Sequence, residues 1–134
     1  MNISPYHEVR TALKVLAVDD THAIVKLIKD ILSPRGYLVE TAEDGPTALL
    51  KYVQFKPDIV TLDLTMPGMS GYETLTKILE KNKRAIVIIL TANDEDVALQ
   101  ECMKRGAAGY VNKPFRPSEL VDALQTAAVT AGIE

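Results

Sequence analysis

Short apolar runs alternate strictly with longer segments of helical period along this sequence, and that alternation narrows the possible folds most. The run Ala85–Leu90 is apolar throughout, as expected of a strand that is covered on both faces. The segment Thr21–Arg35 spaces its apolar residues three and four positions apart, which is typical of an amphipathic helix. Strict alternation predicts an α/β fold, with a five-stranded parallel sheet and helices on both faces. We predict strands at Lys14–Val18, Tyr37–Ala42, Ile59–Leu62, Ala85–Leu90 and Gly109–Val111, and helices at Thr21–Arg35, from the cap Asp44 to about Phe55, and at Gly71–Lys81, Asp94–Lys104 and Pro117–Ala131.

These five strand–helix units leave no gap for a second domain. Residues 1–12 read as a short N-terminal extension and residues 13–134 as one domain. The longest apolar run is far shorter than the roughly 20 residues that a membrane span needs. The first residues also lack the apolar segment of a secretory signal peptide. We therefore expect a cytoplasmic protein that does not insert into a membrane.

Charge and cysteine content narrow the function further. The formal net charge is −3 and there is no basic block, whereas a dedicated nucleic-acid binder needs clustered Lys and Arg to neutralise phosphates. Direct nucleic-acid binding is therefore not expected. Cys102 is the single cysteine, so no internal disulfide can form, which fits a reducing compartment. Its place beside Met103 on a predicted helix favours packing over reactivity.

Polar residues follow four of the five predicted strands at the point where each strand ends. Asp19 and Asp20 follow the first strand, Asp63 the third, Thr91 the fourth, and Lys113 comes shortly after the fifth. Ligands of open parallel sheets bind beyond the carboxyl ends of the strands. Each residue alone could cap a helix or stabilise a turn. Their position along one edge of one sheet favours a shared chemical site.

The residue types at this edge indicate phosphoryl chemistry. Three neighbouring carboxylates repel one another unless a positive group lies among them. An all-oxygen site suits a hard cation such as Mg²⁺, or Mn²⁺ in its place. Lys113 can pair with phosphate, and the hydroxyl of Thr91 can bind a phosphoryl oxygen. Because a carboxylate can also be a nucleophile, the residues suggest cation-assisted phosphoryl transfer to an aspartate.

Four motifs carry a resemblance to a known family over about Lys14–Leu124. They are VDD at 18–20, DIVTLDLTMPGMSG at 58–71, LTA at 90–92 and GAAGYVNKPF at 106–115. As a set, they resemble the receiver domain of two-component response regulators, of the CheY-like single-domain type. The resemblance implies a flavodoxin-like sheet with strand order 2-1-3-4-5. It also implies a signalling domain that supports only its own phosphorylation and dephosphorylation, and so is not an enzyme acting on other substrates.

The resemblance assigns roles to residues around the third strand. Asp63 is implied to accept the phosphoryl group. Asp20 is implied to ligate Mg²⁺ directly, while Asp19 helps to position it. The backbone carbonyl of Thr65 is implied to complete the protein ligands. Thr65 and Asn93 are two positions that should border the path of attacking water, and neither is acidic.

The resemblance also implies which residues bind the phosphoryl group, which proteins donate it and where a target protein docks. Thr91 and Lys113 are implied to bind the phosphoryl group, with a cis bond between Lys113 and Pro114. Tyr110 matches the family's aromatic switch position. The implied phosphoryl donor is a histidine kinase or a histidine phosphotransfer protein. The implied target is a protein that docks on the face of the fourth predicted helix, fifth strand and fifth helix, and the resemblance is to regulators of the chemotaxis type.

Other functions remain open at the level of sequence. A phosphatase of the haloacid dehalogenase type would also use an aspartate, a threonine, a lysine and Mg²⁺. That family normally has a second aspartate two residues after the nucleophile, where this chain has Thr65. A receiver domain cut from a larger regulator or hybrid kinase is a second alternative. A regulator that binds partners without phosphorylation is a third, ranked last because the key residues are all present.

Overall fold

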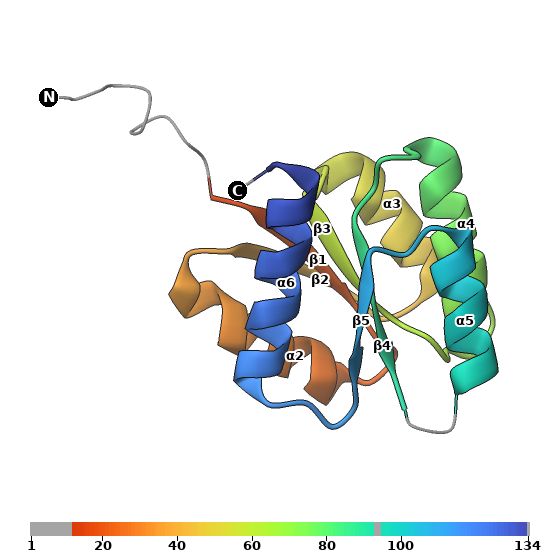
Figure 1. Ribbon diagram of the computed structural model, residues 1–134, viewed down its shortest axis with the longest axis horizontal. Coiled ribbons are helices and arrows are strands. Elements are labelled where there is room, and N and C mark those ends of the chain that lie inside the picture. Colours follow the sequence, from red (N-terminus) through yellow and green to blue (C-terminus); the bar gives the residue numbers. More distant parts are fainter. Residues whose placement is uncertain (1–11, 93–94, 134) are drawn as a thin grey trace, which may run out of the picture.

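Five parallel strands form one sheet in the order β2-β1-β3-β4-β5, with helices on both of its faces (Figure 1). The predicted fold class and the strand order implied by the family resemblance are therefore confirmed. This computed structural model describes residues 12–92 and 95–133, so most of the predicted N-terminal extension, Asn93 and Asp94 lie outside the described residues. The elements are β1 Lys14–Val18, α2 His22–Leu32, η1 Ser33–Arg35, β2 Leu38–Ala42, α3 Gly45–Phe55, β3 Ile59–Asp63, α4 Gly71–Lys81, β4 Val87–Thr91, α5 Asp96–Arg105, β5 Gly109–Asn112 and α6 Pro117–Ala131.

Each face of the sheet has its own hydrophobic core, because successive side chains of a strand point to opposite faces. In β3, Ile59 packs into one core while Val60 and Leu62 pack into the other. Helices α2 and α6 cover one face of the sheet and α3, α4 and α5 cover the other (Figure 1). Each group of helices contributes side chains to the core on its own face. This two-sided burial is the reason why the strands read as continuous apolar runs. Of the helices within residues 12–92 and 95–133, none is long and apolar enough to cross a membrane.

Two predicted helices have the bounds that the sequence indicated, whereas several other elements begin or end one or two residues away from the predicted bounds, and two of these differences have a clear cause. The helices α4 and α6 begin and end at the predicted residues. The predicted helix Thr21–Arg35 is instead an α-helix followed by the 3-10 turn η1, because Pro34 has no N–H and its ring hinders a regular helix. The predicted strand Ala85–Leu90 begins two residues later, since Ala85 N–H closes a turn onto Asn82 O at 2.9 Å.

The start of α3 provides a first testable prediction. The Asp44 side chain accepts a hydrogen bond of 2.7 Å from the Thr47 N–H, and this bond lowers the pKa of Asp44. Asp44→Ala should lower the free energy of unfolding by about 1 kcal/mol, because an N–H at the helix start loses its partner. Urea unfolding measures the change. The exposed Asp122→Ala in α6 is the control and should stay within about 0.5 kcal/mol of the parent protein; an equal loss in both variants would contradict the capping role.

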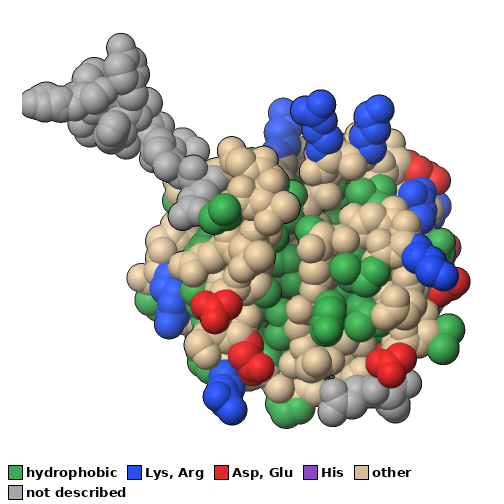
Figure 2. All heavy atoms as spheres, in the orientation of Figure 1, with side chains coloured by type: hydrophobic (Ala, Val, Ile, Leu, Met, Phe, Trp, Pro, Cys, Tyr) green, Lys and Arg blue, Asp and Glu red, His purple; other side chains and the backbone are tan. Residues whose placement is uncertain are grey.

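A shallow groove crosses β5 between α5 and α6. Met103 of α5, Tyr110 of β5, and Ala123 and Ala127 of α6 contribute to its lining. Hydrophobic side chains gather on this side of the molecule, where β5 lies between the two helices (Figure 2). Tyr110 is 50% exposed there. This groove coincides with the face that the family resemblance implied for partner docking.

Candidate functional site

The strand register brings the predicted site residues to the same edge of the sheet. Val18 of β1 pairs with Leu62 of β3, so the residues that follow them, Asp19 and Asp63, are neighbours across the two strands. Asp63 is opposite Leu90 of β4, directly before Thr91. A one-residue slip would turn these side chains to the opposite face, so the buried strands fix the geometry of the site.

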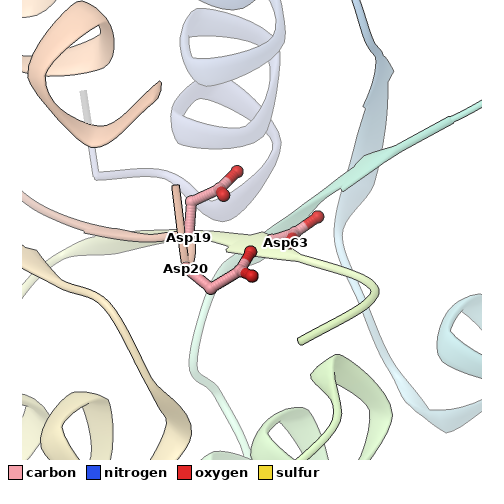
Figure 3. Close-up of side chains that lie close together, drawn as sticks. All are labelled: Asp19, Asp20 and Asp63. Atoms are coloured by element: carbon pink, nitrogen blue, oxygen red, sulfur yellow. The ribbon is translucent and has the colours of Figure 1, made fainter. Parts of the chain in front are cut away.

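Three carboxylates converge at this edge. Figure 3 shows the side chains of Asp19, Asp20 and Asp63 close together at the ends of β1 and β3. One carboxylate oxygen from each lies within 4.8 Å of the others. Asp19 and Asp63 are almost completely buried, whereas Asp20 is exposed. The cluster therefore has two rigid buried members and one that faces solvent.

Lys113 holds two of these carboxylates together. Its Nζ lies 2.8 Å from Asp19 Oδ2 and 2.9 Å from Asp63 Oδ1. Partial burial alone would lower the pKa of Lys113, but its contacts with Asp19 and Asp63 outweigh burial and raise that pKa. Lys113 is therefore charged at neutral pH. The implied cis bond between Lys113 and Pro114 is present.

The carboxyl group of Asp63 ionises with difficulty. Burial raises its pKa from the ordinary 3.8 to about 6; the charge of Asp19 and a hydrogen bond with Asp20 add to the rise, while Lys113 opposes it. Burial of a carboxyl group, aided by a neighbouring like charge, causes this kind of shift. A perturbed carboxyl group beside a lysine is typical of functional sites.

Asp63 should make the metal-free protein less stable as the pH rises. Between about pH 4 and about pH 6, the folded chain keeps a proton on Asp63 that the unfolded chain has lost. This contribution stabilises the fold at the acid end and is lost as the pH rises through about 6, by on the order of 3 kcal/mol. Urea unfolding in EDTA across this range measures it.

The matched control for this pH dependence is Asp63→Asn, which has no proton to lose. Its free energy of unfolding should fall less between about pH 4 and about pH 7 than that of the parent protein. Saturating Mg²⁺ should also offset the loss at the higher pH, since a cation favours ionised carboxylates. Identical pH profiles for the two proteins would show that Asp63 has an ordinary pKa.

The carboxylate cluster fits a hard divalent cation. Its donors are oxygens from Asp19, Asp20 and Asp63, the ligand type that Mg²⁺ and Mn²⁺ prefer. Asp19 Oδ2 is buried and receives no hydrogen bond of good geometry, although Lys113 lies beside it. Asp19 Oδ1, in contrast, accepts one of 2.9 Å from the Thr21 N–H. The cluster therefore has a buried carboxylate oxygen, paired with the Lys113 ammonium, that could also face a cation or a water molecule bound to one.

Thr91 lies at the end of β4 and is tied to a residue that the sequence did not indicate. Its Oγ1 is 3.1 Å from Ala92 O and 3.4 Å from Glu95 Oε1. The Ala92 N–H donates to the same Glu95 oxygen at 2.8 Å, and the Thr65 hydroxyl donates to Glu95 Oε2. Partial burial raises the pKa of Glu95, but these bonds outweigh it and lower the pKa below its usual value. Glu95 is therefore an ionised carboxylate at neutral pH.

Glu95 was not predicted as a site residue, because it lies four residues after the end of β4 and not directly at the strand end. It joins the site only when the loops after β3 and β4 fold next to each other. A carboxylate close behind a strand-end threonine was the one available signal. The sequence also predicted that Cys102 packs rather than reacts: it is fully buried, and burial raises its pKa to about 11.

Comparisons with known proteins agree with this geometry. The family model described as "Response regulator receiver domain" matches residues 15–125. The chain is 39% identical over 112 residues to a chemotaxis protein CheY of Thermotoga maritima, which covers 83% of this chain and 93% of the relative. It is 40% identical over 117 residues to a chemotaxis protein CheY of Listeria monocytogenes, covering 87% and 98%. The structure of chemotaxis protein CheY4 of Vibrio cholerae matches with a TM-score of 0.83 and 35% identity, covering 87% of this chain and 99% of that one. The chain thus belongs to the family of response regulator receiver domains, and its relatives include CheY proteins of chemotaxis.

Proposed function

We propose that this receiver domain accepts a phosphoryl group on Asp63 and thereby changes the surface that it offers to a partner protein. The observation that carries the proposal is the setting of Asp63. It is a buried strand-end carboxylate, with Asp19 and Asp20 on one side and the Lys113 ammonium 2.9 Å away. A carboxylate so placed can act as a nucleophile while neighbouring positive charge stabilises the incoming oxygens.

In the proposed transfer, an ionised oxygen of Asp63 attacks the phosphorus atom of a phosphohistidine. The new O–P bond forms as the P–N bond breaks, and the donor imidazole leaves with the electron pair. Lys113 contacts both Asp19 and Asp63, so its ammonium can shift to a phosphoryl oxygen without leaving the site. Asp19, Asp20, Asp63 and the backbone carbonyl of Thr65 would hold Mg²⁺, which would supply further charge compensation for the phosphoryl oxygens.

The proposed switch runs from Asp63 through Thr91 to Tyr110. A phosphoryl group on Asp63 offers new acceptors to the buried Thr91 hydroxyl. Movement of Thr91 would open space for Tyr110, which is now half exposed in the groove between α5 and α6. Such a shift biases a pre-existing equilibrium between two arrangements of the α5-β5-α6 face. A target protein that binds one arrangement more tightly would then bind the phosphorylated domain differently from the unphosphorylated one.

The proposed partners follow from this mechanism. The phosphoryl donor is a histidine kinase or a histidine phosphotransfer protein, and the target is a protein rather than DNA or a membrane. A stand-alone chemotaxis-type regulator in the cytoplasm is the version that we favour, because the CheY relatives are covered almost from end to end. A receiver domain within a larger regulator would use the same site residues.

Phosphorylation by a small donor tests the proposal directly. Acetyl phosphate with Mg²⁺ should add one phosphoryl group to the protein, seen by intact mass, and EDTA should prevent it. Beryllofluoride with Mg²⁺ should shift the backbone amide resonances of Thr91 and Tyr110. No modification and no shift would overturn the proposal. Catalytic turnover of small phosphate esters would instead support the phosphatase alternative.

A further inference from the structure

Glu95 connects the two loops that flank the proposed acceptor. One of its oxygens accepts from the Ala92 N–H at 2.8 Å and lies 3.4 Å from Thr91 Oγ1. The other accepts from the Thr65 hydroxyl. Thr65 comes two residues after Asp63, and Thr91 ends the neighbouring strand. A single carboxylate therefore ties both sides of the site together.

The hydroxyl of Thr91 cannot serve two anionic acceptors at once. It has one proton to donate, and the structure places it near Ala92 O and Glu95 Oε1. Under the function proposed above, the same hydroxyl donates to a phosphoryl oxygen on Asp63. Binding of the phosphoryl group therefore competes with the contact to Glu95.

We propose that Glu95 is a positioning residue that holds Thr65 and Thr91 in the unphosphorylated arrangement and so opposes occupation of Asp63. This inference rests on the proposed function of the site. A ligand shifts a two-state equilibrium only by its different affinity for the two states. If Glu95 favours the resting arrangement, removal of its charge should raise the affinity of the site for any phosphoryl-like group.

The competing explanation is that Glu95 only stabilises the start of α5. It directly precedes that helix and accepts a hydrogen bond from the Ala92 N–H. A purely structural role predicts a less stable protein whose affinity for phosphoryl mimics is unchanged or weaker. The two explanations therefore differ in the sign of the affinity change.

The test uses beryllofluoride with saturating Mg²⁺ as the phosphoryl mimic. Glu95→Gln keeps the shape of the side chain and removes its charge. We expect the dissociation constant, measured from the amide resonance of Lys113, to fall about three- to tenfold, the equivalent of one net hydrogen bond. Glu101→Gln removes the same charge from an exposed position of α5 and should stay within about twofold of the parent protein. Equal affinity in both variants would overturn the inference.

A second experiment, in the Thr91→Ala variant, shows whether Glu95 changes the affinity for beryllofluoride through its contact with Thr91. In Thr91→Ala, the further change Glu95→Gln should alter the dissociation constant for beryllofluoride by at most about twofold, because the hydroxyl for which Glu95 and the phosphoryl group compete is absent. A full effect in that background would also overturn the inference. If Glu95→Gln does not unfold cooperatively, Thr65→Val replaces it and should tighten binding about twofold or more; no tightening would count against the proposal. Failure of the parent protein to bind beryllofluoride would instead contradict the proposed function itself.

Discussion

Asp63→Asn is expected to abolish labelling by acetyl phosphate, a loss of at least about 100-fold. The amide of asparagine is a poor nucleophile and cannot form the acyl phosphate that an aspartate forms. The substitution keeps the size of the side chain at a position that is only 5% exposed, so the fold should survive. It also removes a carboxyl group that is hard to ionise in this site. Intact mass spectrometry after incubation with acetyl phosphate and Mg²⁺ measures the loss.

The control for this experiment is Asp30→Asn. Asp30 forms an exposed i,i+4 ion pair with Lys26 on α2, with 2.9 Å between the charged atoms. Such surface pairs contribute little to stability, so the variant should be labelled as the parent protein is. Labelling that persists in Asp63→Asn would move the acceptor to another residue, and Asp20 would be the next to substitute.

Gly71→Ala should cause the largest loss of stability among single methyl additions to the described glycines. A Cβ at Gly71 would lie 2.4 Å from Asp63 O, 2.6 Å from Leu64 O and 2.7 Å from Leu64 Cα. All three atoms belong to the backbone, which cannot move aside as a flexible side chain can. The Gly71 N–H also donates to Leu64 O at 3.0 Å. We expect a loss of about 3 kcal/mol in the free energy of unfolding, measured by urea unfolding.

Gly109→Ala is the matched control for overpacking. A Cβ at Gly109 would meet no heavy atom within 4 Å, and alanine costs less entropy than glycine in a strand. This variant should unfold at the same urea concentration as the parent protein or slightly higher. Because the loop to Gly71 follows β3, the clash should also displace Asp63, so that Gly71→Ala is phosphorylated more slowly. A Gly71→Ala protein of normal stability would contradict the close approach.

The pattern of apolar residues predicted the architecture well because burial on both faces leaves a clear trace in the sequence. The helix Gly71–Lys81 was predicted with the same first and last residues that the structure shows. Ser70 caps its start, because the Ser70 side chain accepts a hydrogen bond from the Glu73 N–H. Strand ends were harder to place. Apolar character reports burial, whereas a strand ends where its hydrogen bonds end, which is why β4 begins at Val87 and not at Ala85.

The candidate site could be predicted in part because parallel strands bring their carboxyl ends together. Asp19, Asp63 and Thr91 each follow or end a buried strand, and the register aligns them. Their roles in phosphoryl transfer, and those of Lys113, stay predictions. Glu95 could not be predicted in this way, because its place depends on how two loops pack and not on where a strand ends.

The contacts of Lys113 bear on how the carboxylate cluster is compensated when no metal ion is bound. Two of the three acidic side chains already have a counterion that is part of the chain, 2.8 Å and 2.9 Å away. The folded chain therefore compensates these two carboxylates without a metal ion. Under the proposed function, the concentration of free Mg²⁺ in the cell would set how readily the domain is phosphorylated.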